Sequence, residues 1–184
     1  MELPTTPKRS AAPPLHTIGW REWVALPELG VEAVKVKVDT GAHSSALHAF
    51  NIQEFQREDE AWVRFDLHPF QRDSQHSVAA ESKLVGRRWV KSSSGRSTLR
   101  PVIRTKIKLG KKVWRTEVTL VRRDVMGFRM LLGRRTVRRR FLVDCGRSFQ
   151  ASEKPEGRAG RPHKKAVDKK VERRKKKLSG TEEA

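Results

Sequence analysis

The chain has 184 residues, which is enough for one domain of ordinary size with additional tails. Apolar residues make up 36% of it and charged residues 34%, a composition that allows a small core and excludes a chain disordered throughout. The single cysteine excludes an intrachain disulfide framework, and the formal net charge of +20 favours polyanions and acidic ligands as partners.

The positive charge is spread over the whole chain. Residues 151–184 hold 12 Lys and Arg against 6 Asp and Glu, a net charge of +6. The first 150 residues hold the other 29 against 15, a net charge of +14. The folded part therefore carries a positive field of its own, which suits nucleic acid, ribosomal surfaces and acidic peptides alike.

The two ends differ in composition from the centre. Residues 1–16 are rich in Pro, Ser, Thr and Ala, and residues 151–184 contain almost no large apolar side chains. Neither segment can bury enough surface to offset the entropy of ordering, so we expect a disordered arm and a disordered basic tail around a domain of residues 17–150. Residues 173–177, RRKKK, are either a contact for RNA or a ribosome or a solubilising segment.

The sequence shows no sign of a membrane segment. No apolar run reaches the roughly 18 residues that a spanning helix needs, and the N-terminus lacks the apolar stretch of a secretion signal. The lone Cys145 agrees with a reducing compartment. We therefore expect a cytoplasmic protein without membrane contact.

Inside the domain the dominant hydrophobic period is two. Alternating apolar residues predict half-buried antiparallel strands over 34–39, 62–67, 103–109 and 113–121. Glycine followed by lysine at 110–111 separates the last two strands and predicts a tight hairpin turn. These elements indicate a mostly β fold, a small barrel or sandwich of short strands.

Helical patterns are scarce. One short helix is expected over 134–141, because Val137 and Phe141 lie four residues apart and would share a helix face. This helix would lie near the C-terminal end of the domain.

The first predicted strand runs directly into Asp39, Thr40 and Gly41. This triplet is often an ordinary turn after a strand. It can also be half of an aspartic-protease site, where two carboxylates face one water, share a proton and act as general base and general acid. In that case the glycine allows a tight turn behind the acid, and the threonine hydroxyl bonds across to the other half.

A second stretch, residues 128–135, reads FRMLLGRR. With it the sequence resembles the retropepsin-like aspartic proteases, which pair an Asp-Thr-Gly-Ala loop with a later apolar-apolar-Gly-Arg strand leading into a short helix. The resemblance implies a small closed β-barrel and assigns Asp39, Thr40 and Gly41 to the catalytic loop. It also implies a supporting role behind that loop for Ala42, Leu131, Leu132, Gly133 and Arg134.

The resemblance narrows to a bacterial subgroup through residues 100–135 and the segment 141–149, FLVDCGRSF. This subgroup is usually labelled "ATP-dependent zinc protease" and is often encoded beside a RimK-type glutamate ligase. The resemblance implies proteolysis of glutamate-extended tails on a ribosomal protein.

The sequence itself does not support the metal and nucleotide in that label. There is no His-Glu-x-x-His motif, and His43 and His48 are poorly spaced for one helix face. A phosphate-binding Gly-x-x-x-x-Gly-Lys-Ser/Thr loop is also absent. We therefore expect no metal site and no cofactor.

Only one Asp-Thr-Gly is present in the chain. The nearest variant, at Asp144, has cysteine in the hydroxyl position and reads as a turn after a strand. With one aspartate per chain, a catalytic pair has to come from two copies related by a two-fold axis, so we expect a homodimer with both copies of Asp39 at its centre.

A protease of this kind needs a flap over its substrate. The polar segment 91–100, KSSSGRSTLR, is either a flexible hairpin tip of this sort or an ordinary surface loop. As a flap it would offer Ser94, Gly95, Arg96 and Arg100, and its arginines would favour an acidic substrate. His43 departs from the family, because many retropepsins have an acid there that pairs with the arginine after the glycine.

Two functions follow from these residues. The first is a homodimeric aspartic peptidase that cleaves acidic peptide, with Asp39 from each copy in the dyad. The second is a catalytically inactive, protease-like module that binds RNA or a ribosomal protein through its basic surface and tail.

Overall fold

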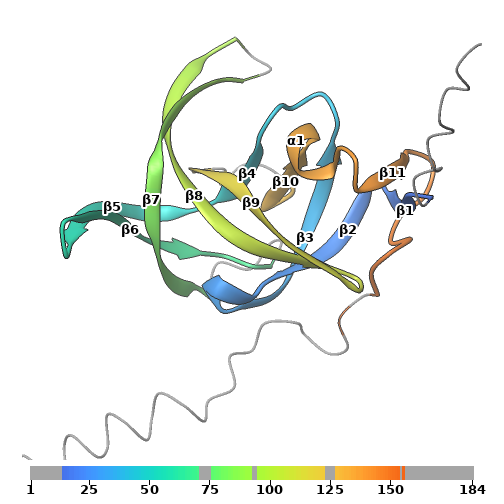
Figure 1. The fold of residues 1–184 in the computed structure, drawn as a ribbon, viewed down its shortest axis with the longest axis horizontal. Coiled ribbons are helices and arrows are strands. Elements are labelled where there is room, and N and C mark those ends of the chain that lie inside the picture. The colour runs from blue at the N-terminus through green and yellow to red at the C-terminus, as the bar shows by residue number, and fades with distance from the viewer. Residues whose placement is uncertain (1–13, 71–75, 93–94, 123–126, 154, 156–184) are drawn as a thin grey trace, which may run out of the picture.

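The computed structural model describes residues 14–70, 76–92, 95–122, 127–153 and 155. In this part the chain is mostly β, with eleven strands and one short α-helix (Figure 1). No helix among the described residues is long and apolar enough to cross a membrane. Most of the predicted arm and tail, and Ser94 of the predicted flap, lie outside the described residues.

The strands are short except for a central pair. They are β1 (His16–Gly19), β2 (Arg21–Leu26), β3 (Val31–Asp39), β4 (Ser45–His48), β5 (Phe50–Arg57), β6 (Glu60–Leu67), β7 (Val78–Lys91), β8 (Ser97–Leu109), β9 (Lys112–Val121), β10 (Met130–Gly133) and β11 (Phe141–Asp144). A 3-10 helix, η1, covers Pro27–Leu29, and the α-helix α1 covers Arg134–Val137.

The four predicted strands are confirmed as parts of β3, β6, β8 and β9. Their apolar faces are buried as the alternation indicated; in β8, for example, Ile103, Thr105, Ile107 and Leu109 are buried. The hairpin turn at 110–111 is also confirmed, because β8 ends at Leu109 and β9 begins at Lys112. Gly110 has a φ of 55°, a value that glycine adopts without strain.

The predicted helix over 134–141 is too long. The helix ends at Val137, and Arg139 has a φ of 63°, which turns the chain out of the helix. Phe141 then begins β11 and pairs in parallel with His16 of β1, while its ring packs 5.5 Å from that of Trp114. Val137 and Phe141 are both buried, but in different elements. The spacing of four residues between Val137 and Phe141 therefore indicated two buried positions and not one helix face.

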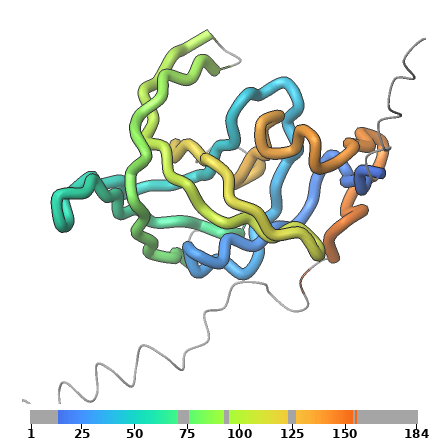
Figure 2. The backbone as a smooth tube through the Cα atoms, in the orientation of Figure 1, coloured from blue at the N-terminus to red at the C-terminus, as the bar shows by residue number. Residues whose placement is uncertain are grey.

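Nine strands form one sheet in the order β2-β3-β10-β4-β9-β8-β7-β6-β5. Ala25 of β2 also pairs with Lys108 of β8, so six of these strands form a closed circuit. The antiparallel pairing predicted for the four strands holds for β6 and β8, whereas β3 and β9 each also have one parallel neighbour, β10 and β4 respectively. In the sheet β10 lies between β3 and β4, and Figure 2 traces the same backbone path as a tube.

The core fills the inside of this circuit. Apolar side chains from β2, β3, β8, β9 and β10 meet there, and Val36, Ile103, Val118 and Leu132 are each 0% exposed. Burial of side chains of this size contributes about 1.5–3 kcal/mol each relative to leaving them in water. Two hairpins extend from the closed part, β5–β6 and the distal half of β7–β8 (Figure 1).

A buried carboxylate joins the end of the domain to β2. Glu22 is 0% exposed, and its Oε1 accepts hydrogen bonds from the backbone N–H of Gly19 at 2.7 Å, Gln150 at 2.8 Å and Ala151 at 3.3 Å. The Ser152 hydroxyl donates to Oε2 of the same carboxylate and accepts from the backbone N–H of Trp23 at 2.8 Å. Four donors thereby compensate the cost of burying the charge.

Glu22→Ala is expected to lower the free energy of unfolding by about 3 kcal/mol or more, since the variant leaves buried backbone donors without an acceptor. Urea denaturation monitored by tryptophan fluorescence measures this loss. Glu32→Ala, an exposed acid on β3, is the matched control and should change stability by less than about 0.5 kcal/mol. Equal effects of the two substitutions would contradict the role of Glu22.

Candidate active site

Asp39 is the last residue of β3 and is half-buried. The backbone N–H of Ala42 donates to the Asp39 carbonyl oxygen at 3.2 Å and to its Oδ1 at 3.1 Å. These bonds close a tight turn in which Thr40 and Gly41 are exposed. The turn therefore holds the Asp39 carboxylate through Oδ1.

The strand β10 lies directly beside Asp39. Leu132 pairs with Val38 and Gly133 pairs with Asp39 in the parallel register of β3 and β10. On its other side β10 pairs antiparallel with β4, where Leu131 lies opposite Ala46. The Asp-Thr-Gly motif and the Leu-Leu-Gly-Arg motif, far apart in the chain, therefore lie at the ends of two neighbouring strands of one sheet.

Gly133 lies where no side chain fits. A Cβ at this position would lie 2.4 Å from the carbonyl carbon and oxygen of Ser44. The Gly133 N–H donates to the Ser45 hydroxyl at 3.0 Å. The loop between β3 and β4 therefore packs onto the end of β10 through backbone atoms. This contact fixes the position of Asp39 relative to β10.

Arg134 holds the same loop from the other side. Its backbone N–H donates to the carbonyl oxygen of Ala42 at 2.7 Å, and its guanidinium Nη1 donates to that of Thr40 at 2.9 Å. The next backbone N–H, of Arg135, donates to the carbonyl oxygen of His43 at 3.1 Å. With His43 in place of the acid found in many retropepsins, the Arg134 guanidinium binds the backbone carbonyl of Thr40 instead.

Buried hydroxyl groups support the loop from below. The Ser45 Oγ lies 2.7 Å from the Thr136 Oγ1, which lies 2.9 Å from the Thr116 Oγ1. The Thr119 hydroxyl donates to the Ser45 carbonyl oxygen at 3.0 Å. This network joins β4, β9 and α1, and none of its members was expected from the sequence. Serine and threonine carry no pattern that distinguishes a buried network from a surface loop.

At the start of the segment 91–100, Lys91 ends β7 and pairs with Ser97, which begins β8. We call the distal part of these two strands, residues 88–92 and 95–100, the flap hairpin. At its tip the backbone N–H of Ser92 donates to Arg96 O at 2.8 Å, and that of Gly95, with a φ of 83°, donates to Ser92 O at 2.9 Å. In Figure 1 the hairpin rises from the body and curves towards the side of β4 and α1.

A groove of about 750 Å³ runs between the flap hairpin and the Asp39 loop. Asp39, Gly41, Ala42 and Leu131 of the predicted site line it, together with Arg100 from the flap hairpin. Gly95 and Arg96 are exposed and are not among the lining residues. The structure therefore brings together five predicted residues from three separate segments.

Several lining residues were missed by the sequence analysis. Lys37, Lys91 and Phe128 line the groove. Lys37 precedes Asp39 by two residues on the same strand face, so the alternation of β3 was a usable signal. The lining contains three basic side chains, Lys37, Lys91 and Arg100, and one acid, Asp39.

No group of three or more His, Cys, Asp or Glu side chains among the described residues lies close enough to hold a metal ion. His43 is exposed in the loop, whereas His48 is buried with its ring 5.9 Å from that of His68. The two histidines therefore have different surroundings and do not face a common site.

Glu117 of β9 lies near the base of the flap hairpin and binds three arginines. Its carboxylate accepts from Arg88 at 2.8 Å, Arg135 at 3.2 Å and Arg104 at 3.3 Å. The hydrogen bond from Arg88 is the largest of the effects that hold the pKa of Glu117 below its usual 4.5. One acid thereby links the flap hairpin, the central sheet and α1.

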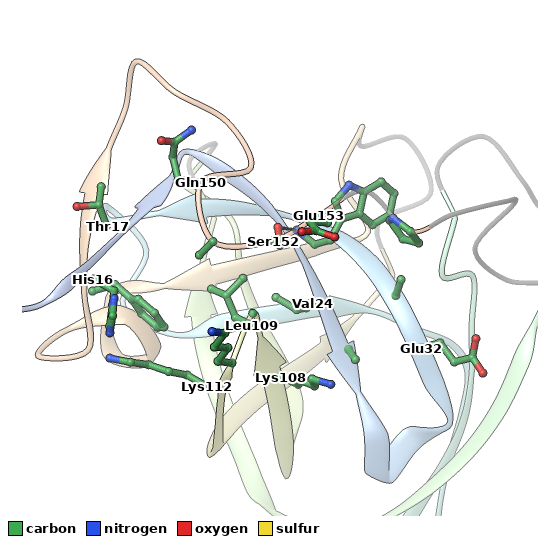
Figure 3. A pocket seen from close by; sticks show the side chains of 18 residues that line it. His16, Thr17, Val24, Glu32, Lys108, Leu109, Lys112, Gln150, Ser152 and Glu153 are labelled. Atoms are coloured by element: carbon green, nitrogen blue, oxygen red, sulfur yellow. Dashed lines mark hydrogen bonds between the residues drawn. The ribbon is translucent and has the colours of Figure 1, made fainter.

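A second cavity, of about 720 Å³, lies away from Asp39. Figure 3 shows His16, Lys108 and Lys112 along one side of it and Ser152 and Glu153 along the other. The Lys112 ammonium group is engaged with the carbonyl oxygen of Arg140 at 3.2 Å and lies 5.0 Å from the Phe141 ring centre. The cavity thus borders the segment that Glu22 binds.

A mostly β fold in which an Asp-Thr-Gly loop packs onto an apolar-apolar-Gly-Arg strand defines the retropepsin-like class. Residues 17–154 match the family model described as RimB-like, retropepsin-like aspartic endopeptidase RimB. The chain belongs to this RimB-like family, which confirms the resemblance indicated by the two motifs.

Curated relatives carry a different name. The chain is 50% identical over 137 residues to a probable alpha-L-glutamate ligase of Shewanella pealeana and 50% identical over 127 residues to one of Desulfotalea psychrophila. These matches cover 74% and 69% of this chain but only 30% and 27% of the relatives. The chain therefore spans less than a third of the length of these two proteins.

One solved structure is similar over most of the domain. It is the crystal structure of protein Lpg0085, of unknown function, from Legionella pneumophila subsp. pneumophila str. Philadelphia 1, with a TM-score of 0.61 and 29% sequence identity. The match covers 74% of this chain and 98% of that one.

Gly133→Ala is expected to destabilise the domain by about 3 kcal/mol, because the new Cβ overlaps the Ser44 backbone, which cannot move without shifting Asp39. Thermal or urea unfolding measures the change. Gly127→Ala is the matched control, since a Cβ there meets no described atom within 4 Å. An alanine variant at 133 with wild-type stability would contradict the close packing of the loop on β10.

Glu117→Gln is expected to lower stability by about 1 kcal/mol at pH 7. The folded pKa of Glu117 is depressed, so its contribution is present above the unfolded value of 4.5 and is lost as the pH falls through the lowered pKa. The stability difference between wild type and variant should therefore shrink below pH 4.5. Urea titrations at several pH values measure it, and a difference independent of pH would contradict the ion-pair origin.

Proposed function

We propose that the protein is an aspartic peptidase whose catalytic pair consists of Asp39 from two copies of the chain. The observation that carries this proposal is the half-buried Asp39 carboxylate in a groove beneath a hairpin, held by the loop and strand of the retropepsin-like class. One copy supplies one such carboxylate. A two-fold arrangement supplies the second.

The chemistry follows from two close carboxylates. They cannot both ionise easily, so the pair shares one proton. The ionised member takes a proton from water as it attacks the peptide carbonyl, while the protonated member donates to the carbonyl oxygen. The collapse of the tetrahedral intermediate returns a proton to the leaving amine. In this scheme the exposed Thr40 hydroxyl bonds across the two-fold axis to the other loop.

The fold suits this role. We interpret the closed circuit of six strands as the small closed β-barrel of the class, because β2 returns to β8 through Ala25 and Lys108. The flap hairpin covers the groove and excludes water from the bound peptide. The hydrogen bonds that join Ser92 to Arg96 and Gly95 to Ser92 are local, which suits a segment that has to open for substrate.

The proposed substrate is an acidic peptide. Three basic residues line the groove, and the net charge of the chain is +20. The relatives named as glutamate ligases contain a segment like this chain within a longer protein, which supports a link to glutamate addition. We therefore propose cleavage of glutamate-extended tails, such as those on a ribosomal protein, in the cytoplasm. The exposed, free Cys145 agrees with that compartment.

Asp39→Asn is expected to reduce cleavage of a glutamate-tailed peptide at least about a thousandfold, because asparagine can neither share the proton nor act as a base. Full-length wild type and variant are compared by mass spectrometry of the products, with and without a metal chelator. The variant should retain its unfolding curve and its mass in solution. Cleavage that resists the chelator supports the aspartate mechanism.

Two outcomes would contradict the proposal. Normal cleavage by the Asp39→Asn variant would remove Asp39 from the mechanism, and cleavage abolished by the chelator would indicate metal chemistry. A wild-type protein that binds the peptide or RNA tightly but never cleaves would instead support the inactive binding module.

A further inference from the structure

Two arginines face each other across the flap hairpin. Arg88 of β7 and Arg100 of β8 are direct partners in the antiparallel register. Both side chains are half-buried rather than spread into solvent. Like charges directly opposite one another on neighbouring strands repel, so this pairing requires a compensating negative charge.

The nearby acid does not supply enough charge. Arg88 donates through Nη2 to Glu117, but the same carboxylate also binds Arg104 and Arg135. Three guanidinium groups are therefore bound to one carboxylate, and Arg100 adds a fourth positive charge opposite Arg88. Of these four arginines, Arg100 is the one that lines the groove.

One donor of Arg88 is buried without a partner. Its Nη1 is inaccessible to solvent and makes no hydrogen bond within the described residues. A buried guanidinium N–H without an acceptor costs about 1–3 kcal/mol, so such groups are rare unless they have a functional use.

Arg100 places a second half-buried guanidinium group at the wall of the groove. Its Nε donates to the Thr98 hydroxyl at 2.8 Å, and the residue lines the groove that contains Asp39. Burial lowers the pKa of Arg100, which marks its surroundings as poor in water. A partly desolvated guanidinium binds a carboxylate more strongly than an exposed one.

We propose that Arg88 and Arg100 form a carboxylate-binding subsite that selects an acidic side chain of the peptide in the Asp39 groove. Planar guanidinium groups present paired N–H donors that match the two oxygens of a carboxylate. A glutamate or aspartate side chain bound to Arg100 in the groove would relieve the repulsion between the two arginines. The assignment of this subsite to peptide cleavage rests on the proposed function, whereas carboxylate binding does not.

The subsite is tested by binding in the full-length Asp39→Asn background, where cleavage does not interfere. Fluorescently labelled pentaglutamate and pentaglutamine peptides are titrated at about 150 mM salt, where charges further apart than about 8 Å are largely screened. Arg88→Gln and Arg100→Gln should each weaken pentaglutamate binding about tenfold and leave pentaglutamine binding unchanged. The two losses should be non-additive, because Arg100 and its cross-strand partner Arg88 act on one bound carboxylate.

Arg96→Gln is the matched control, since it removes the same charge from the exposed tip of the same hairpin, outside the groove lining. It should change the affinity less than about twofold. Arg100→Lys keeps the charge without the planar fork and should show an intermediate loss. Unfolding curves of the Arg88 and Arg100 variants confirm that the domain remains folded.

The outcomes separate this proposal from the peptidase. Equal losses in Arg96→Gln and Arg100→Gln, or no selective binding of pentaglutamate, would overturn the subsite. Selective binding through both arginines by a protein whose wild type never cleaves would keep the subsite and reject the peptidase. Cleavage without preference for acidic peptides, unaffected by the arginine variants, would keep the peptidase and reject the subsite.

Discussion

The contact between the Asp39 loop and the end of β10 is the constraint on which the rest of the site depends. The backbone of Ser44 lies where a side chain of residue 133 would be, so only glycine allows the loop to close on the strand. Once closed, the loop carbonyls of Thr40, Ala42 and His43 accept from the first residues after Gly133. The loop that carries Asp39 is thereby held by backbone contacts together with the Arg134 guanidinium and the Ser45 hydroxyl.

Three acids of this domain each bind more than one base. Glu81 pairs with Arg57 and Arg64, Glu28 with Lys106 and Arg115, and Glu117 with three arginines. Such surface pairs add little stability individually. Because the chain has 41 Lys and Arg against 21 Asp and Glu, an excess of positive charge remains. The groove is one place where this excess is concentrated, which explains why an acidic ligand suits it.

The flap hairpin connects these two features. The flap hairpin is the distal part of β7 and β8, and the proximal part of β8 belongs to the closed sheet. Local backbone hydrogen bonds join Ser92, Gly95 and Arg96 at its tip. Arg88 and Arg100 are cross-strand partners in this hairpin; Arg88 binds Glu117, and Arg100 lines the groove. The pair therefore connects the charges below the hairpin with the groove.

The sequence by itself determined the four alternating strands, the turn at Gly110 and the two motifs around Asp39 and Gly133, because period-two burial and glycine-dependent turns are local properties. It did not determine that β10 runs parallel to β3, that the helix stops at Val137, or that Ser45 and Thr136 share a buried hydrogen bond. Those features depend on which distant segments become neighbours. Only the tertiary structure decided that Arg100, and not Arg96, lines the groove, because the strand register sets which side chains of a hairpin face inward.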